Sequence, residues 1–365
     1  SSDLLPHMIA VVLRPAADGL KIVTLGSQGG GIQHYVGSGQ NANTVATFDC
    51  VTFNTCTATG TWTNAYGGGT NTDAYTAKFI DCTFTDCTAR YGGAFSNCSN
   101  NNGNALGSLT ITGCTFTSCN TTANSNGGDN GGAVWTSKKT VSVNGTNFTS
   151  CAARKSGGGI YHSNNNESSL TLTRCTFDNC TTTIANMTGG GVNTNAITVT
   201  VDGTSFTGCT STGNGGGIWT SAESVNVAGT ESGKITFDAC TALNGSGGGI
   251  CIDNSSNAMT LKDCAFAGCR AKENGGAVQS NGKTLTARRC AFNGQWDTVG
   301  NNAKNGGAVY ASSKAAQTQT QIVGCTFEKL VLRATAMGLG TCWMAGTFNR
   351  EQFAGLLGVK EDEIF

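Results

Sequence analysis

The stretch Cys82-Thr-Phe84-Thr-Asp-Cys87, followed by Gly92-Gly-Ala-Phe95, decides the fold because most of the chain consists of copies of it. Ten phenylalanines mark ten such units, and a repeat of this length is typical of one turn of a solenoid. We expect the seven of these side chains from Phe84 to Phe266 to form a stacked core. The ten residues are Phe53, Phe84, Phe116, Phe148, Phe177, Phe206, Phe237, Phe266, Phe292 and Phe327.

The second half of the repeat is a glycine motif, Gly-Gly-(Gly/Ala)-(Ile/Val), which recurs after a polar segment of variable length. The copies begin at Gly131, Gly157, Gly189, Gly215, Gly247, Gly275 and Gly306.

Three short strands per turn can be read from each unit. Before each Cys-x-Phe comes a run in which apolar residues alternate with Thr, as in Leu109-Thr-Ile111-Thr, and this period of two is typical of a half-buried strand. The alternation then shifts by one residue before Cys114 and Phe116, so we expect the chain to turn a corner there. A second strand carries Cys and Phe inward, and the glycine motif opens a third. This pattern predicts an all-β fold, a single parallel β-helix of about ten rungs with terminal caps.

Composition agrees with this interpretation. The 365 residues include 53 Gly, only 2 Pro and 12% charged residues, and a Pro within a ladder of turns would remove a backbone hydrogen bond. The formal net charge of zero gives no electrostatic basis for binding nucleic acid or an anionic membrane. The apolar run 8–13 is too short to span a bilayer, so we expect no membrane insertion.

The repeat also divides the chain. Residues 1–45 fit it poorly, and we expect them to supply N-terminal cap strands and a first glycine motif at Gly29. Residues 46–329 carry the β-helix repeats. Residues 330–365 are expected to form a C-terminal cap or assembly segment, with a short amphipathic helix beginning near Asn349, a plausible N-cap residue.

Cysteines form two columns in this register. The first column stands three residues after each phenylalanine and the second stands two residues before it, where Thr146, Thr204 and Ile235 interrupt it. The first column comprises Cys56, Cys87, Cys119, Cys151, Cys180, Cys209, Cys240 and Cys269. The second includes Cys82, Cys114, Cys175 and Cys264, followed by Cys290 and Cys325.

Two interpretations of the cysteines remain open. A metal centre would favour close Cys pairs with histidine partners, and a catalytic thiol would need one distinctive Cys with a basic neighbour. The repeated columns offer neither arrangement. We therefore expect no metal, cofactor or catalytic residue. The thiols are then either small apolar core residues or partners in disulfides between adjacent turns. The high cysteine content favours an oxidising, extracellular setting.

The tetrapeptides resemble a known family. Alternating Gly-Gly-Ala-(Ile/Val/Leu) and Phe-x-x-Asn motifs mark the polymorphic outer membrane protein repeats of chlamydial autotransporters. Gly131 to Val134 matches the first motif, whereas Phe84-Thr-Asp-Cys87 carries Cys in place of Asn. The resemblance implies a right-handed β-helix displayed outside a cell, with adhesive or structural work and no catalytic residues.

Three kinds of function were compared. A pectin-lyase-like enzyme needs carboxylates clustered with Arg or Lys, and the sequence spreads its Asp residues over many turns. Ice binding would use Thr-x-Thr pairs such as Thr110 and Thr112, but Ser142 and Asn226 interrupt that array. A binding module could use the aromatic residues that follow the glycine motif, as a row on which sugar rings stack; the alternative is that these rings pack under neighbouring loops. The four candidates are Trp135, Tyr161, Trp219 and Tyr310.

The sequence therefore predicts an extracellular, non-enzymatic β-solenoid that builds a surface fibre or coat and has a possible adhesive role. Its expected partners are copies of itself, in a homo-oligomer or head-to-tail polymer, and a glycan or host-surface ligand. A glycan-binding adhesin and a polysaccharide-active enzyme are the alternatives.

Overall fold

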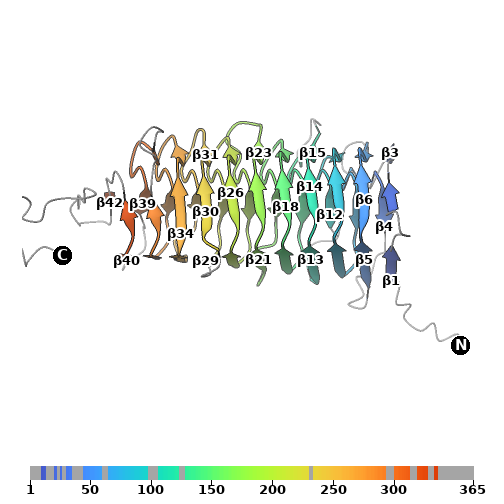
Figure 1. The fold of residues 1–365 in the computed structure, drawn as a ribbon, viewed down its shortest axis with the longest axis horizontal. Helices are drawn as coiled ribbons and strands as arrows, with labels where there is room; N and C mark the ends of the chain where they lie inside the picture. Colours follow the sequence, from blue (N-terminus) through green and yellow to red (C-terminus); the bar gives the residue numbers. More distant parts are fainter. Residues whose placement is uncertain are drawn as a thin grey trace, which may run out of the picture.

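The structure, a computed structural model, is a parallel β-solenoid whose turns follow one another along the longest axis of the molecule (Figure 1). It describes residues 10–13, 20–22, 25–26, 30–34, 44–59, 65–97, 106–122, 128–229, 233–292, 300–312, 319–327 and 333–335. Every secondary-structure element assigned within these ranges is a β-strand, which confirms the predicted all-β class. The helix predicted near Asn349 lies outside the described residues, and so does the structure of most of 330–365.

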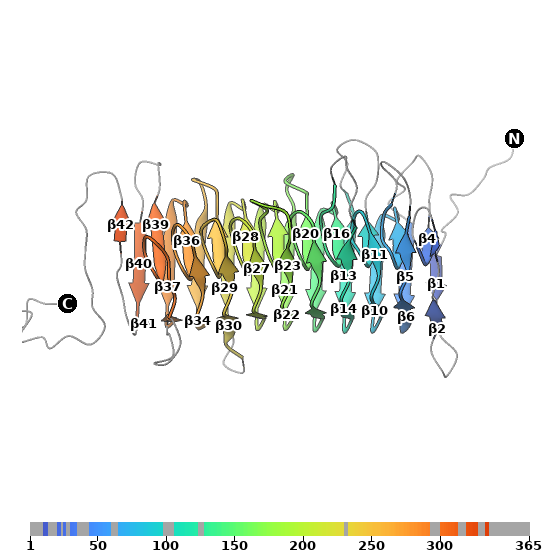
Figure 2. The ribbon, with the colours of Figure 1, turned by 90° about the horizontal axis from the view of Figure 1, so that it is seen from above.

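The strands form four parallel sheets, and as far as β35 each turn contributes one strand to each sheet, so that strands four places apart pair. Beyond β35 the third sheet has no assigned strand among the described residues, and strands three places apart pair, as β36 and β39 do. Three of the sheets have eleven strands and one has nine. The prediction of three strands per turn is therefore wrong by one strand. Figure 2 shows the sheets running side by side along the solenoid.

The first sheet holds the alternating runs that precede each Cys-x-Phe. From β5 to β37 its five-residue strands bury the second and fourth side chains, as Leu109 and Ile111 do, and point the others outward. Its strands are β1 (Ala10–Leu13), β5 (Val45–Asp49), β9 (Thr76–Ile80), β13 (Ser108–Thr112), β17 (Thr140–Asn144), β21 (Ser169–Thr173), β25 (Thr198–Asp202), β29 (Ser224–Ala228), β33 (Ala258–Lys262), β37 (Thr284–Arg288) and β40 (Gln319–Val323).

The second sheet carries the phenylalanines. Nine of them, from Phe53 to Phe292, are fully or almost fully buried and stack in register, with centroids of neighbouring rings 4.6 to 5.1 Å apart. Its strands are β2 (Leu20–Ile22), β6 (Val51–Asn54), β10 (Thr83–Thr85), β14 (Thr115–Thr117), β18 (Asn147–Thr149), β22 (Thr176–Asp178), β26 (Ser205–Thr207), β30 (Ile235–Asp238), β34 (Cys264–Ala267), β38 (Ala291–Phe292) and β41 (Thr326–Phe327).

The third sheet is the one that the sequence analysis missed. Its strands have two residues each, too few for an alternating pattern to be visible. A signal was nevertheless present, because the residue two places after the first-column Cys is small and buried in each turn from Ala58 to Ala271. The strands are β3 (Leu25–Gly26), β7 (Thr57–Ala58), β11 (Thr88–Ala89), β15 (Asn120–Thr121), β19 (Ala152–Ala153), β23 (Thr181–Thr182), β27 (Thr210–Ser211), β31 (Thr241–Ala242) and β35 (Arg270–Ala271).

The fourth sheet follows the glycine motif, and its first and third residues face the core. The strands are β4 (Ile32–His34), β8 (Thr70–Thr72), β12 (Phe95–Asn97), β16 (Val134–Thr136), β20 (Ile160–His162), β24 (Val192–Thr194), β28 (Ile218–Thr220), β32 (Ile250–Ile252), β36 (Val278–Ser280), β39 (Val309–Ser312) and β42 (Arg333–Thr335).

The predicted corner between the first two sheets is a single residue with positive φ. Gly113 (φ 65°), Gly145 (φ 56°) and Arg174 (φ 52°) stand there in three successive copies, so one residue in the left-handed region shifts the alternation by one place. A second left-handed residue, such as Asn179 (φ 52°), makes the corner into the third sheet.

The first two positions of the motif require glycine for different physical reasons. Gly189 has a φ of 70°, which favours glycine. At Gly190 a Cβ would lie 2.3 Å from the carbonyl oxygen of Gly216 in the next turn and 2.6 Å from the backbone of Thr210. The close contact between backbones at this corner therefore excludes any side chain.

The strands at either end continue the same register. β1 to β4, within the predicted cap 1–45, pair with β5 to β8 in all four sheets and so form a further turn of the solenoid. At the other end β42, beyond residue 329, pairs with β39.

Candidate functional site

The first cysteine column lies inside the solenoid at the corner between the second and third sheets. All eight side chains are fully buried. From Cys87 onward each thiol donates a hydrogen bond to the carbonyl oxygen of the phenylalanine one turn earlier, with sulfur-to-oxygen distances of 3.3 to 3.7 Å. Burial raises the pKa of the thiols of Cys119, Cys180 and Cys240, which opposes formation of reactive thiolates.

Sixteen cysteines fall within the described residues, and all sixteen are free thiols there. The structure thus has the core-packing arrangement, and the interpretation with disulfides between turns is not seen in the described part of the chain. In the second column Cys82 and Cys114 lie on adjacent turns, where the Cys82 amide donates to the Cys114 sulfur at 3.4 Å. Cys175 lies between turns that carry Thr146 and Thr204, and its amide donates to Thr204.

The four aromatic candidates occupy the middle, outward-facing position of the fourth sheet, but they do not form a continuous row. Trp135 and Tyr161 are in register on adjacent strands. Trp219 instead has Asn193 and Cys251 as its neighbours. Tyr310 lies farther along, next to Gln279.

Trp135 is not an open platform for a sugar ring, since its exposed fraction is only 9%. Tyr91 packs against it with ring centroids 5.3 Å apart, and Tyr66 lies 6.3 Å from it. Tyr66 and Tyr91 stack on each other at 5.0 Å. We call these three rings the aromatic patch. In it the half-buried rings of Tyr66 and Tyr91 lie over Trp135. The sequence analysis missed both tyrosines, although each directly precedes a glycine motif.

Charged residues adjoin the aromatic patch. The Arg90 guanidinium lies over the Tyr91 ring, 5.4 Å from its centroid, and 3.8 Å from a carboxylate oxygen of Asp129. Arg154 approaches the other carboxylate oxygen at 3.9 Å. Asp129 and Arg90 are each only 2% exposed. Two guanidinium groups thus face one carboxylate beside the aromatic patch.

Asp129 is held in an unusual conformation by its backbone. Its φ is 60°, and its carbonyl accepts hydrogen bonds from the Thr121 hydroxyl at 3.1 Å and the Lys155 amide at 2.9 Å. Burial raises the pKa of the Asp129 carboxyl, and the charges of Arg154 and Arg90 oppose that shift. Its Oδ1 atom is buried and has no hydrogen-bond partner among the described residues.

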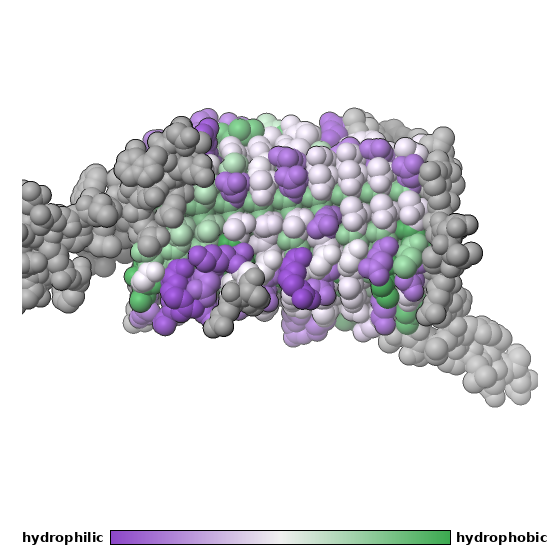
Figure 3. All heavy atoms as spheres, in the orientation of Figure 1, coloured by the Kyte–Doolittle hydropathy of each residue, from purple (hydrophilic) through white to green (hydrophobic). Residues whose placement is uncertain are grey.

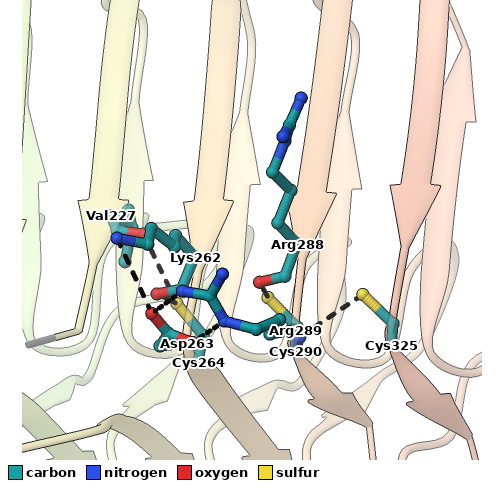
Figure 4. Close-up of polar contacts among 8 residues, drawn as sticks. All are labelled: Val227, Lys262, Asp263, Cys264, Arg288, Arg289, Cys290 and Cys325. Atoms are coloured by element: carbon teal, nitrogen blue, oxygen red, sulfur yellow. Dashed lines mark hydrogen bonds and ion pairs between the residues drawn. The ribbon is translucent and has the colours of Figure 1, made fainter. Parts of the chain in front are cut away.

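A second group of charges gathers where the sequence analysis expected dispersion. A shallow cleft at the edge of the first sheet is lined by Asp202, Lys262, Asp263 and Arg289, which come from three different turns. The Arg289 guanidinium binds both carboxylate oxygens of Asp263, each at 2.7 Å, and Lys262 lies 3.9 Å away (Figure 4). The prediction that no carboxylates cluster with a base is therefore wrong at this cleft, because stacked turns bring residues 26 or more positions apart together.

The chemistry available in this cleft is limited by the ion pair. Hydrogen bonding to Arg289 lowers the pKa of Asp263, so that this carboxylate stays ionised and occupied. Glycoside hydrolysis needs one carboxyl group as an acid and a second as a base or nucleophile. Within the described residues no three His, Cys, Asp or Glu side chains converge on a point where a metal ion could bind.

The outer surface of the second sheet carries rows of threonine, interrupted by Asp178 and Asp238. Thr83 and Thr115 are in register there, as are Thr85 and Thr117. Figure 3 shows rows of pale, near-neutral residues along the solenoid, interrupted by hydrophilic ones. Among the described residues no helix is long and apolar enough to cross a bilayer.

Comparisons with known proteins add little. A family model described as "Putative TM nitroreductase" matches residues 278–362, less than half of the chain. The described part of that segment consists of solenoid strands from β36 to β42. No curated protein matches. No solved structure matches either. The resemblance to chlamydial repeats therefore holds at the level of a parallel β-solenoid and shows no membership of that family.

Proposed function

We propose that this protein is an extracellular, non-enzymatic structural solenoid that joins head to tail into a surface fibre or coat. The observation that carries the proposal is the register of the end strands. Within the described residues β1 has one partner, β5, and β40 has one partner, β37. A parallel strand with one neighbour presents backbone groups that a strand of another chain can pair with.

The repetitive interior supports a mechanical role. Phenylalanine occupies the same place in nine successive turns, and the end strands continue the backbone register of the interior, so that a second chain could extend it. Such a contact between the two different ends is heterologous and extends without closing. The likeness to repeats displayed outside cells supports the extracellular location.

Imaging of negatively stained protein over a range of micromolar concentrations tests this proposal. We expect filaments, and we expect them to disappear when residues 1–45 or residues 330–365 are deleted. Circular dichroism of the deleted chains is the control that their solenoid still folds. Single short rods at every concentration would contradict self-assembly.

A second candidate is glycan binding at the aromatic patch. Tyr66 and Tyr91 are half-buried, and the partly exposed Arg154 near them provides donors for the hydroxyl or carboxylate groups of a sugar. Aromatic faces and planar guanidinium groups together suit an acidic glycan.

Isothermal titration with an oligosaccharide of uronic acids tests this candidate. We expect Tyr91→Ala to abolish the heat of binding, whereas Tyr310→Ala, far along the same sheet, leaves it unchanged. Equal binding by both variants would rule out the aromatic patch as the site.

A further inference from the structure

The outer face of the second sheet is a long strip with charged residues at both of its edges. Its strands are in register from β6 to β34, and small side chains such as Thr83, Thr115 and Thr176 recur along it. Figure 3 looks onto this face, with near-neutral rows along its middle and hydrophilic residues gathered mainly towards the two long edges. One edge borders the first sheet and the other borders the third.

Opposite charges occur together at two positions of the repeat. The first position is three places before the phenylalanine, at the edge next to the first sheet. The second position is one place after the phenylalanine, towards the third sheet. Arg174 and Asp178 occupy the two positions in one turn, and Lys234 and Asp238 occupy them two turns later. From Asn54 to the turn of Phe266 no other turn has an acid at the second position. Each acid of this column thus shares its turn with a base.

These four charges are not used within their own chain. All four side chains are exposed or partly exposed, and none takes part in an ion pair found among the described residues. Arg174 donates to the neutral Asn144 side chain at 3.3 Å. Arg289, at the same position of a later turn, is by contrast bound to Asp263. The base and the acid of each pair lie at opposite edges of the strip, so both are available to one partner surface.

From this arrangement we propose that the outer face of the second sheet binds the same face of a second copy, with the two solenoids side by side and parallel. A twofold axis along the solenoid keeps each turn opposite its equivalent and exchanges the two edges. Arg174 of each copy then lies opposite Asp178 of the other, and Lys234 lies opposite Asp238. A twofold axis across the solenoid would bring each edge against the same edge, without this complementarity.

The position of the axis follows from the same residues. Residue 176 is two places from both 174 and 178, so the axis runs over its row and Thr176 lies against its own copy. Small side chains let two sheets pack about 10 Å apart, a gap that Arg and Lys side chains on the two edges can span. In the turn of β10 the first position is Asp81, which meets the neutral Thr85 with Asp86 beside it. That turn opposes pairing, and the two turns with bases favour it.

The size of the strip indicates a reversible contact. Eight strands about 4.8 Å apart, each about five residues wide, cover on the order of 600 Å² per copy. Stable complexes bury about 800 Å² per partner, so isolated chains should pair weakly. This inference rests on the proposed function, because two head-to-tail rows would repeat the contact along a fibre and so strengthen it.

A cysteine on the axis tests the pairing in the full chain. Thr176→Cys places a thiol opposite its own copy, so a short thiol-reactive cross-linker should produce a covalent dimer on a denaturing gel. Thr171→Cys lies in the same turn on the outer face of the first sheet and is the matched control. It should give no more dimer than the wild-type chain, whose exposed Cys50 sets the background.

Charge reversal tests which edges meet. One variant combines Arg174→Asp with Lys234→Asp, and the other combines Asp178→Arg with Asp238→Lys. Each variant alone brings like charges together, so sedimentation should show association weakened at least about tenfold. An equal mixture should recover association, because each reversed edge then meets its opposite. Circular dichroism verifies that both variants keep the fold.

Equal cross-linking of Thr176→Cys and Thr171→Cys would overturn the pairing, and so would a mixture that associates no better than the separate variants. Imaging separates this result from failure of the head-to-tail fibre. Filaments one solenoid wide, without cross-linking at residue 176, would retain the fibre and overturn the pair. Short rods two solenoids wide, with cross-linking at residue 176, would retain the pair and overturn the fibre.

Discussion

The second and fourth sheets share one repeat, yet they differ in what each turn places at the middle of its strand. In the second sheet this residue faces the core and is phenylalanine in nine successive turns. In the fourth sheet it faces outward and changes from Trp135 to Tyr161 to Asn193 along the solenoid. An interior side chain has its own copies as neighbours, so one residue type satisfies every turn. An outward side chain contacts loops that differ between turns, so its identity follows the loop.

The largest expected effect comes from breaking the constant stack. Phe177→Ala removes a ring held 4.6 Å from Phe148 and 4.8 Å from Phe206. Truncation of a buried Phe costs roughly 3 to 5 kcal/mol of unfolding free energy. Denaturant unfolding measures it, and Trp219→Ala on the fourth sheet is the control. If Trp219→Ala lowered the unfolding free energy as much as Phe177→Ala, the distinction between the two sheets would be contradicted.

An intermediate effect is expected from the buried histidine of the fourth sheet. His162 donates to the Lys138 carbonyl at 2.8 Å, and its other ring nitrogen is 3.2 Å from the Thr194 hydroxyl. Burial lowers its pKa to about 4 from an ordinary 6.5. The neutral ring is therefore stabilising above pH 6.5, and this stability is lost as the pH falls from 6.5 towards 4, by on the order of 3 kcal/mol.

Denaturant unfolding at several pH values between 7 and 4 measures this loss of unfolding free energy. His162→Gln should flatten the dependence in that window. His34, whose pKa burial also lowers, contributes in the same direction and is retained in the variant. An unchanged slope in His162→Gln would show that another group is responsible.

The smallest effect is expected at the surface ion pair of the first sheet. Arg289→Ala removes the bidentate contact to Asp263, but both side chains are partly open to solvent, which screens their attraction. The midpoint of thermal unfolding should therefore change less than in either interior variant, and this change should be smaller still at high salt. A loss comparable to that of Phe177→Ala would mean that this corner organises the solenoid.

The sequence alone determined the solenoid and the place of its corner between the first two sheets. The shift between Ile111 and Cys114 sufficed to place the corner at Gly113, because side chains in a strand must alternate between the two faces. The two-residue third sheet escaped detection, since a strand of that length shows no alternation even though Ala89 and Ala153 mark its buried position.

Only the tertiary structure decided which polar residues meet. Asp202, Asp263 and Arg289 are far apart in the chain, and Asp129 stands in a loop whose path no repeat fixes. Stacking of turns converts a separation of about thirty residues into one strand spacing of about 4.8 Å. The repeat thus specifies each column in the interior, while neighbouring loops and turns decide the contacts on the surface, because those contacts join residues that no local pattern relates.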